Sequence, residues 1–93
     1  MVRQRVPFGE AAFADVVLWK FPVPIPGCVH LFKYRLAFVL AGECVLRYDN
    51  VSGKGDHRHL FGQATSFSFD SPEQLIQDFL SEARRIYRED CGS

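Results

Sequence analysis

The stretch VHLFKYRLAFVLAGECVLRYDN, residues 29–50, decides the fold. Within residues 32–40, a large apolar side chain occupies every second position, and smaller or polar side chains lie between them. This period of two is typical of a β-strand with one buried face. Residues 44–50 repeat the alternation after a short AGE segment, so we expect an antiparallel β-hairpin with its turn at residues 41–43.

The apolar face of this hairpin indicates its register. A three-residue loop at 41–43 sets Leu36 opposite Tyr48 and Leu40 opposite Cys44, which keeps the large apolar side chains on one face. A two-residue loop would instead set Leu36 opposite a basic residue and mix the two faces. We therefore predict the three-residue loop.

The other face of the hairpin carries a cationic stripe of Lys33, Arg35 and Arg47, which Asp49 neutralises in part. Clustered basic residues on one face are typical of a surface that binds phosphate groups, so these three are candidate phosphate-binding or RNA-binding residues. The alternative is that they form ordinary salt bridges on the surface of the sheet.

Further strands are predicted on both sides of the hairpin. Residues 15–21 are rich in β-branched and aromatic side chains, and the proline-rich connector 22–27 closes them. After a turn at 51–55, a new strand begins at Asp56, and residues 65–69 form another short strand in which Ser alternates with Phe. Together with the hairpin, these segments predict an antiparallel sheet.

Residues 71–90 predict a helix. Ser71 is a good N-cap, Pro72 suits the first helical position, and Gln74 completes a capping box. Apolar side chains recur with a period of 3.6 and form one stripe, which we expect to pack on the apolar face of the sheet. The predicted fold class is α+β, with an antiparallel sheet of four to five strands and one C-terminal helix on one face.

The length of 93 residues, of which 47% are hydrophobic, allows one core but not two. We therefore predict a single domain over residues 1–93. The longest apolar run, at residues 36–42, is far shorter than the roughly 20 residues of a membrane helix, and the first ten residues lack the apolar segment of a signal peptide. We expect a cytoplasmic protein without contact to a membrane.

Residues 48–59, YDNVSGKGDHRH, gather two carboxylates, two basic side chains and two histidines around a pair of glycines. A polar hairpin loop would explain them, because such residues turn chains in water. A functional site is the sharper interpretation. On the strand that follows the turn, His57 and His59 share one face, while Asp56 and Arg58 share the other.

The segments FKYRLAFV, RYDN, GKGDHRH and SPEQLIQDFL, with VLWKFPVPIPG ahead of them, resemble the TumE family of small prokaryotic toxin-antitoxin proteins. The resemblance covers residues 15–90. It implies a toxin encoded beside an antitoxin that usually carries a helix-turn-helix DNA-binding domain. It implies no particular reaction.

Small toxins often act on RNA, and RNA cleavage requires no metal or other cofactor. A base takes the 2′-hydroxyl proton, an acid protonates the leaving oxygen, and cations stabilise the charge on phosphate. We hypothesise that His57 and His59 are the acid-base pair of a metal-independent endoribonuclease that inhibits growth. The neighbouring candidates, which would supply charge, donate a proton, stack a base or orient a histidine, are Lys54, Arg58, Tyr48, Asp49 and Asp56.

Other interpretations stay open. The two histidines could have a structural role, or could begin a metal site, for which the sequence offers no compelling third ligand. The alternative function is a non-enzymatic binding protein that forms a complex with its helix-turn-helix antitoxin or another partner. The zero net charge favours this alternative, because strong RNA binding usually accompanies a basic composition. Exposed sheet edges favour a homodimer.

Overall fold

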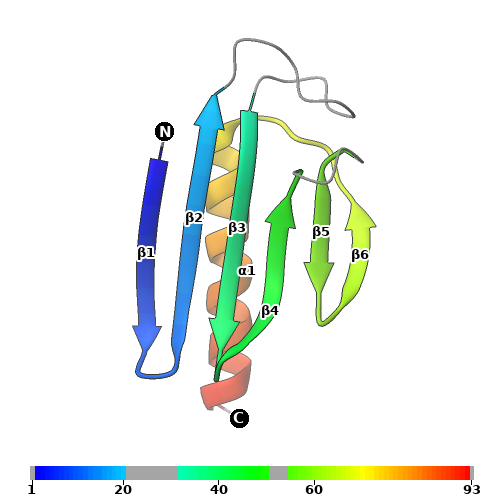
Figure 1. Ribbon diagram of the computed structural model, residues 1–93. Helices are drawn as coiled ribbons and strands as arrows, with labels where there is room; N and C mark the ends of the chain where they lie inside the picture. Colours follow the sequence, from blue (N-terminus) through cyan, green and yellow to red (C-terminus); the bar gives the residue numbers. More distant parts are fainter. Residues whose placement is uncertain (1, 21–31, 51–54, 93) are drawn as a thin grey trace.

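In the computed structural model, which describes residues 2–20, 32–50 and 55–92, a six-stranded antiparallel sheet lies against one helix (Figure 1). The strands lie in the sheet in chain order. The expected α+β class is confirmed, but the sheet has six strands rather than four to five. The elements are β1 (Val2–Gly9), β2 (Ala12–Lys20), β3 (Phe32–Leu40), β4 (Glu43–Asp49), β5 (His57–Leu60), β6 (Gln63–Ser66) and α1 (Pro72–Gly92).

The N-terminal strand β1 is the one that the sequence pattern did not predict. It pairs antiparallel with β2 and forms one edge of the sheet. Val6 and Phe8 pack against the core, but Arg3, Arg5 and Pro7 alternate with them. Charged residues and proline are features that protect an edge strand from pairing further, and they also weaken its sequence signal.

Strands β3 and β4 pair with the predicted register over the part of the hairpin that carries the candidate residues. Leu36 lies opposite Tyr48, and Arg35 lies opposite Asp49. The predicted three-residue loop is wrong. The turn is Ala41–Gly42, whose φ angles of 53° and 81° have the positive sign that a two-residue type I′ turn requires at both positions.

A β-bulge explains why the register holds although the loop is shorter. The register shifts next to Val39, and Val45 is the extra residue on β4. Val45 is buried, and its carbonyl oxygen accepts a hydrogen bond from the Phe61 amide at 2.9 Å. Cys44 pairs with Val39 rather than Leu40 and is exposed, so its predicted place on the apolar face is wrong.

The predicted strand over residues 65–69 is only partly formed, because β6 ends before Phe67. Phe67 and Phe69 lie in the connection to α1 and pack against the core. The centroid of the Phe67 ring lies 5.2 Å from that of Tyr48, and Phe69 stacks on Tyr34 at 5.9 Å. The alternating Ser-Phe pattern thus arises because Phe67 and Phe69 point into the core from the connection to α1. It does not indicate a longer strand.

Helix α1 begins as predicted. The Ser71 hydroxyl oxygen accepts a hydrogen bond from the Gln74 amide at 3.1 Å. The Gln74 side chain donates to Asp78 at 2.7 Å. Ser71 therefore caps the helix, while the Gln74 side-chain amide points along the helix toward Asp78 and not back toward Ser71. The buried apolar core between helix and sheet consists of Ala12, Ala14, Val16, Leu18, Tyr34, Leu36, Phe38, Val45, Leu46, Tyr48, Leu75, Phe79, Ala83 and Ile86.

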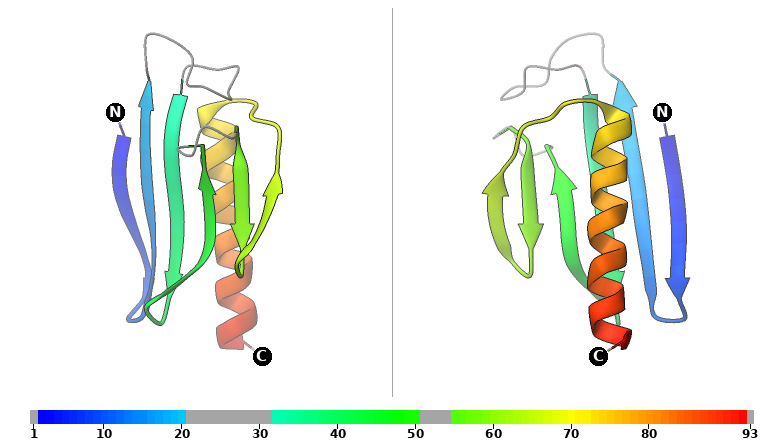
Figure 2. Two further views of the ribbon diagram at one scale, coloured as in Figure 1. Left: turned by 45° about the vertical axis from the view of Figure 1, so that its right-hand side comes forward. Right: turned by 180° about the vertical axis from the view of Figure 1, so that it is seen from behind.

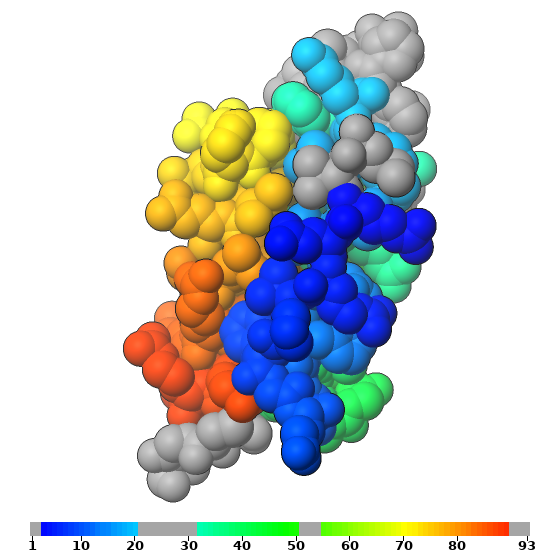
Figure 3. Space-filling view, turned by 90° about the vertical axis from the view of Figure 1, so that its left-hand side faces the viewer, coloured from blue at the N-terminus to red at the C-terminus, as the bar shows by residue number. Residues whose placement is uncertain are grey.

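Helix α1 covers one face of the sheet, behind β2 and β3 in the view of Figure 1, and packs against both of these strands. The views from behind and from the β1 edge show the two layers (Figures 2 and 3). In the described residues, no helix or strand lies on the other face, which we call the open face. Alternate residues of every strand therefore point either to the core or to the open face.

Asn50 continues the pairing of β3 and β4 with its side chain. It is fully buried. Its Oδ1 accepts a hydrogen bond from the Tyr34 amide at 3.0 Å, and its Nδ2 donates to the Phe32 carbonyl at 2.7 Å. The carboxamide thus bonds both backbone groups, as another strand residue would, and fixes the end of β4 from which residues 55–60 return.

We expect Asn50→Ala to lower the free energy of unfolding by about 2–4 kcal/mol, because it removes the side-chain partner of a buried backbone amide and of a partly buried carbonyl group. Urea unfolding followed by circular dichroism measures the change. Gln63→Ala, at an exposed position of β6, is the control and should stay within about 0.5 kcal/mol of the wild type. An equally small effect of Asn50→Ala would contradict the role given to its carboxamide.

Candidate functional site

The open face brings both histidines beside the candidate residues of the central hairpin. His57 lies opposite Asp49, which in turn lies opposite Arg35, so these three side chains form one row across β5, β4 and β3. His59 lies opposite Arg47 in the adjacent row. Neighbouring strands are about 4.8 Å apart, so the row spans roughly 10 Å.

The two imidazoles are close neighbours. Their ring centroids are 6.4 Å apart, with an angle of 34° between the ring planes. His57 Nδ1 lies 2.9 Å from the Gly55 carbonyl oxygen. Because a carbonyl oxygen only accepts hydrogen bonds, this contact requires the proton on Nδ1. In the neutral ring, His57 Nε2 is then the nitrogen that can accept a proton.

The charges beside the histidines are of two kinds. Arg47 Nε lies 2.7 Å from Asp49 Oδ2, and this pair joins a buried carboxylate, 7% exposed, to a guanidinium side chain that is 36% exposed. The ion pair is close, but Arg47 Nε makes no directed hydrogen bond to the described residues. Arg35 is exposed and has no ion pair within the described parts of the chain.

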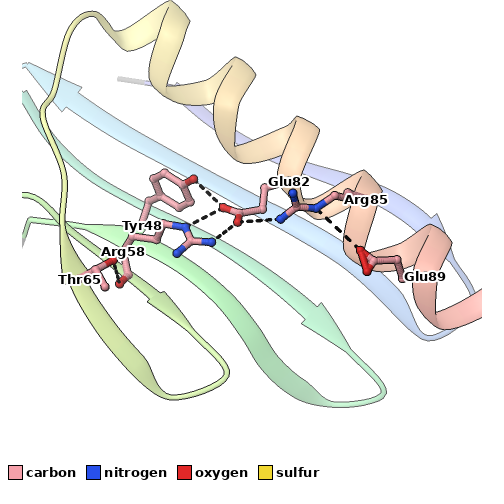
Figure 4. A network of polar contacts seen from close by, with 6 residues as sticks. All are labelled: Tyr48, Arg58, Thr65, Glu82, Arg85 and Glu89. Carbon is pink, nitrogen blue, oxygen red and sulfur yellow. Dashed lines mark hydrogen bonds and ion pairs between the residues drawn. The ribbon is translucent and has the colours of Figure 1, made fainter.

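Two candidates from the same sequence motif, Tyr48 and Arg58, lie on the other face of the sheet, toward α1. Both contact Glu82 of the helix (Figure 4). The Tyr48 hydroxyl donates to Glu82 Oε1 at 2.7 Å, and Arg58 Nε donates to the same oxygen at 2.8 Å. A second Arg58 nitrogen donates to Glu82 Oε2, which also accepts from Arg85 at 3.3 Å.

In the Glu82 network, which consists of Glu82 with Tyr48, Arg58 and Arg85, the charges and hydrogen-bonding groups are paired with one another. Hydrogen bonds from Arg58 lower the pKa of the Glu82 carboxyl group although burial opposes this shift, and the side chain is 12% exposed. The hydrogen bond to Glu82 also raises the pKa of Arg58. Burial, aided by the hydrogen bond to Glu82, raises the pKa of Tyr48 to about 12. At neutral pH a neutral phenol, a carboxylate and a guanidinium satisfy one another.

The remaining candidates are placed elsewhere. Asp56 accepts a hydrogen bond from the hydroxyl of Tyr34, at the end of the sheet beside Asn50. Lys54 and the connector 22–27 lie outside the described residues. Lys33 lies on the open face, opposite Trp19 in the register of β2 and β3.

Glu82 is the residue that the sequence pattern did not reveal. It lies one helical turn after Phe79, at the margin of the apolar stripe of α1. A carboxylate in that position, in a helix expected to cover a sheet with basic residues, is the signal that could have indicated an ion pair between helix and sheet.

No group of three or more His, Cys, Asp or Glu side chains converges within the described residues in a way that could hold a metal ion. In the same residues, α1 is not long and apolar enough to cross a membrane.

We expect Glu82→Gln to lower the free energy of unfolding by about 2 kcal/mol at pH 7, because Arg58 loses a charged partner. The pKa of Glu82 is lowered by folding, so its stabilising effect is present above the ordinary carboxyl pKa and is lost as the pH falls through the folded value. Urea unfolding at pH 7 and at pH 3 should therefore show a smaller difference between variant and wild type at pH 3. A difference that does not change with pH would contradict this account.

Comparison with known proteins gives one match. The family model described as Toxin TumE matches residues 2–87 of the 93, a range that begins in β1 and ends in α1. No curated protein and no solved structure matches the chain. The matched range includes both histidine positions, the central hairpin and the Glu82 network, so the chain belongs to the Toxin TumE family.

Proposed function

We propose that this toxin inhibits growth as an endoribonuclease, and that the His57–His59 pair on the open face carries the reaction. The observation behind the proposal is the pairing of two imidazoles 6.4 Å apart, with the exposed Arg35 in the same row across the sheet as His57. Two titratable rings at this separation leave room for a phosphodiester between them, which general acid-base cleavage requires.

In the proposed reaction, His57 Nε2 accepts the proton of the RNA 2′-hydroxyl, whose oxygen attacks the adjacent phosphorus atom. His59, in its protonated form, donates a proton to the departing 5′-oxygen as the bond from phosphorus to that oxygen breaks. The products are a 2′,3′-cyclic phosphate and a free 5′-hydroxyl. We assign the base to His57 because the Gly55 carbonyl keeps the proton on Nδ1 and leaves Nε2 available.

Cations of the open face would bind the phosphate and stabilise the charge that develops on it. Arg35 is the principal candidate, since it is exposed and no described carboxylate pairs with it. Arg47 is next to His59 but shares its charge with Asp49. Lys33 extends the same stripe along β3. Tyr48 and Arg58 would support the reaction only indirectly, by holding β4 and β5 against α1.

Membership of a toxin family implies an antitoxin partner. We propose that this antitoxin carries a helix-turn-helix domain, as the resemblance implies. We also propose that the chain can form a homodimer through an exposed edge of its sheet.

A non-enzymatic role, with complex formation as the whole function, is the second candidate. The edge strand β6 favours it, since its four residues are exposed and uncharged and so resemble an edge open to strand addition. Phe61 in the preceding turn also favours it. This residue is 65% exposed and has a φ of 48°, which is unusual for a bulky side chain and presents an aromatic anchor to a partner.

His57→Asn separates the two candidates. The asparagine amide nitrogen can take the place of Nδ1 and keep the hydrogen bond to Gly55, but it offers no group in place of Nε2. We expect this variant to fold as the wild type does and to cleave RNA more slowly by a factor of about 100 or more. General acid-base catalysis contributes a rate enhancement of at least about that size. Purified protein and end-labelled RNA measure the rate, and growth after controlled expression measures toxicity.

The control is Gln63→Ala with Thr65→Ala, two exposed polar positions on the core-side rows of β6, which should leave cleavage unchanged. Undiminished cleavage by His57→Asn at equal soluble expression would remove His57 from the reaction. Growth arrest by the wild type and by His57→Asn alike, without any RNA decay, would favour the non-enzymatic candidate.

A further inference from the structure

The open face carries an aromatic side chain that the proposed reaction does not use. Trp19 is on β2, partly exposed, and the Lys33 ammonium nitrogen lies 5.9 Å from the centre of its ring. The chain has no other tryptophan. The open face also holds Phe13, but the Arg5 guanidinium covers that ring at 4.2 Å.

Trp19 lies at a definite place relative to the histidines. Val17, two residues before it, shares the row of Arg35, Asp49 and His57. Trp19 is therefore three strand spacings from His57 across the sheet and one pair of residues further along β2, which is roughly 16 Å. Arg35 and Lys33 lie between the two ends. An aromatic ring, a path of cations and a histidine pair thus follow one another on a single face.

We propose that Trp19 and Lys33 form a binding subsite for a base of single-stranded RNA, and that the strand runs from this subsite past Arg35 to the histidine pair. The inference rests on the proposed action on RNA and adds the class of RNA and its path. The indole would stack on the base, and the Lys33 ammonium group would contact the phosphate of the same nucleotide.

Charge and shape favour this ligand over others. The open face carries five lysine and arginine side chains and two histidines, and each of its two described carboxylates is already paired with an arginine. The cations are Arg3, Arg5, Lys33, Arg35 and Arg47. A polyanion therefore complements this face. A sheet surface cannot enter the deep, narrow major groove of duplex RNA, whereas unpaired bases can lie flat on an exposed ring.

The single tryptophan provides the test. The ligand is a short single-stranded RNA with 2′-O-methyl sugars, which has no 2′-hydroxyl to attack phosphorus and so binds without being cleaved. Stacking of a base on the indole should quench tryptophan fluorescence on titration. The same RNA annealed to its complement should cause little quenching. Quenching that is equal for duplex and single strand would overturn the proposal.

Two variants test how much of the affinity for single-stranded RNA depends on the Trp19 ring. Trp19→Leu should weaken binding of a fluorescently labelled single strand, followed by anisotropy, by about 10-fold, because stacking of one base contributes about 5- to 150-fold in affinity. The matched control, Phe13→Leu, removes the ring that Arg5 covers and should stay within about two-fold. Circular dichroism of both variants checks that each is folded. Equal affinities of wild type and Trp19→Leu would overturn the subsite.

The result is distinguishable from failure of the proposed reaction. If fluorescence is quenched and Trp19→Leu binds weakly, but unmodified RNA is not cleaved, the subsite stands and the endoribonuclease proposal falls. If unmodified RNA is cleaved but neither quenching nor an effect of Trp19→Leu is found, the reaction stands and the subsite is overturned. Absence of any salt-dependent binding overturns the subsite as well.

Discussion

Helix α1 can bury only one face of the six-stranded sheet, and this constraint determines on which face each candidate side chain of the described strands lies. Because strand residues alternate, burial of Tyr48 against the helix puts Asp49 on the open face, and the pairing of β4 with β5 puts His57 there too. The Glu82 carboxylate secures the arrangement by bonding Tyr48 and Arg58 at once. A contiguous motif in the sequence is thereby divided between a structural network and an exposed surface.

This division gives the polar residues of the motif separate roles. Asn50 replaces a missing strand residue with its carboxamide, and the Tyr34 hydroxyl bonds Asp56, so the ends of β4 and β5 are fixed by side chains. His57 and His59 follow directly after Asp56, on a strand that pairs with both of its neighbours. A rigid pair of this kind is what acid-base chemistry at a single phosphate needs.

The fold follows from the sequence wherever alternation is strong, as in the pairing of Leu36 with Tyr48. The prediction of the loop length fails because two local features compensate each other. A short Ala-Gly turn and a bulge at Val45 together produce the register of a longer loop. The shared face of His57 and His59 is predictable from their spacing. The ion pair of Arg58 with Glu82 is not predictable in this way, because it depends on which turn of the helix faces the Arg58 side chain.

The most direct test of the open face as the working surface is nuclear magnetic resonance of side chains during titration with the uncleavable single-stranded RNA. Imidazole signals of His57 and His59 and the guanidinium signal of Arg35 should shift with salt-dependent affinity. Signals of Arg58, bonded to Glu82, and of Arg85 on the helix should stay in place. Shifts confined to the helix arginines, with the histidines unchanged, would contradict the account.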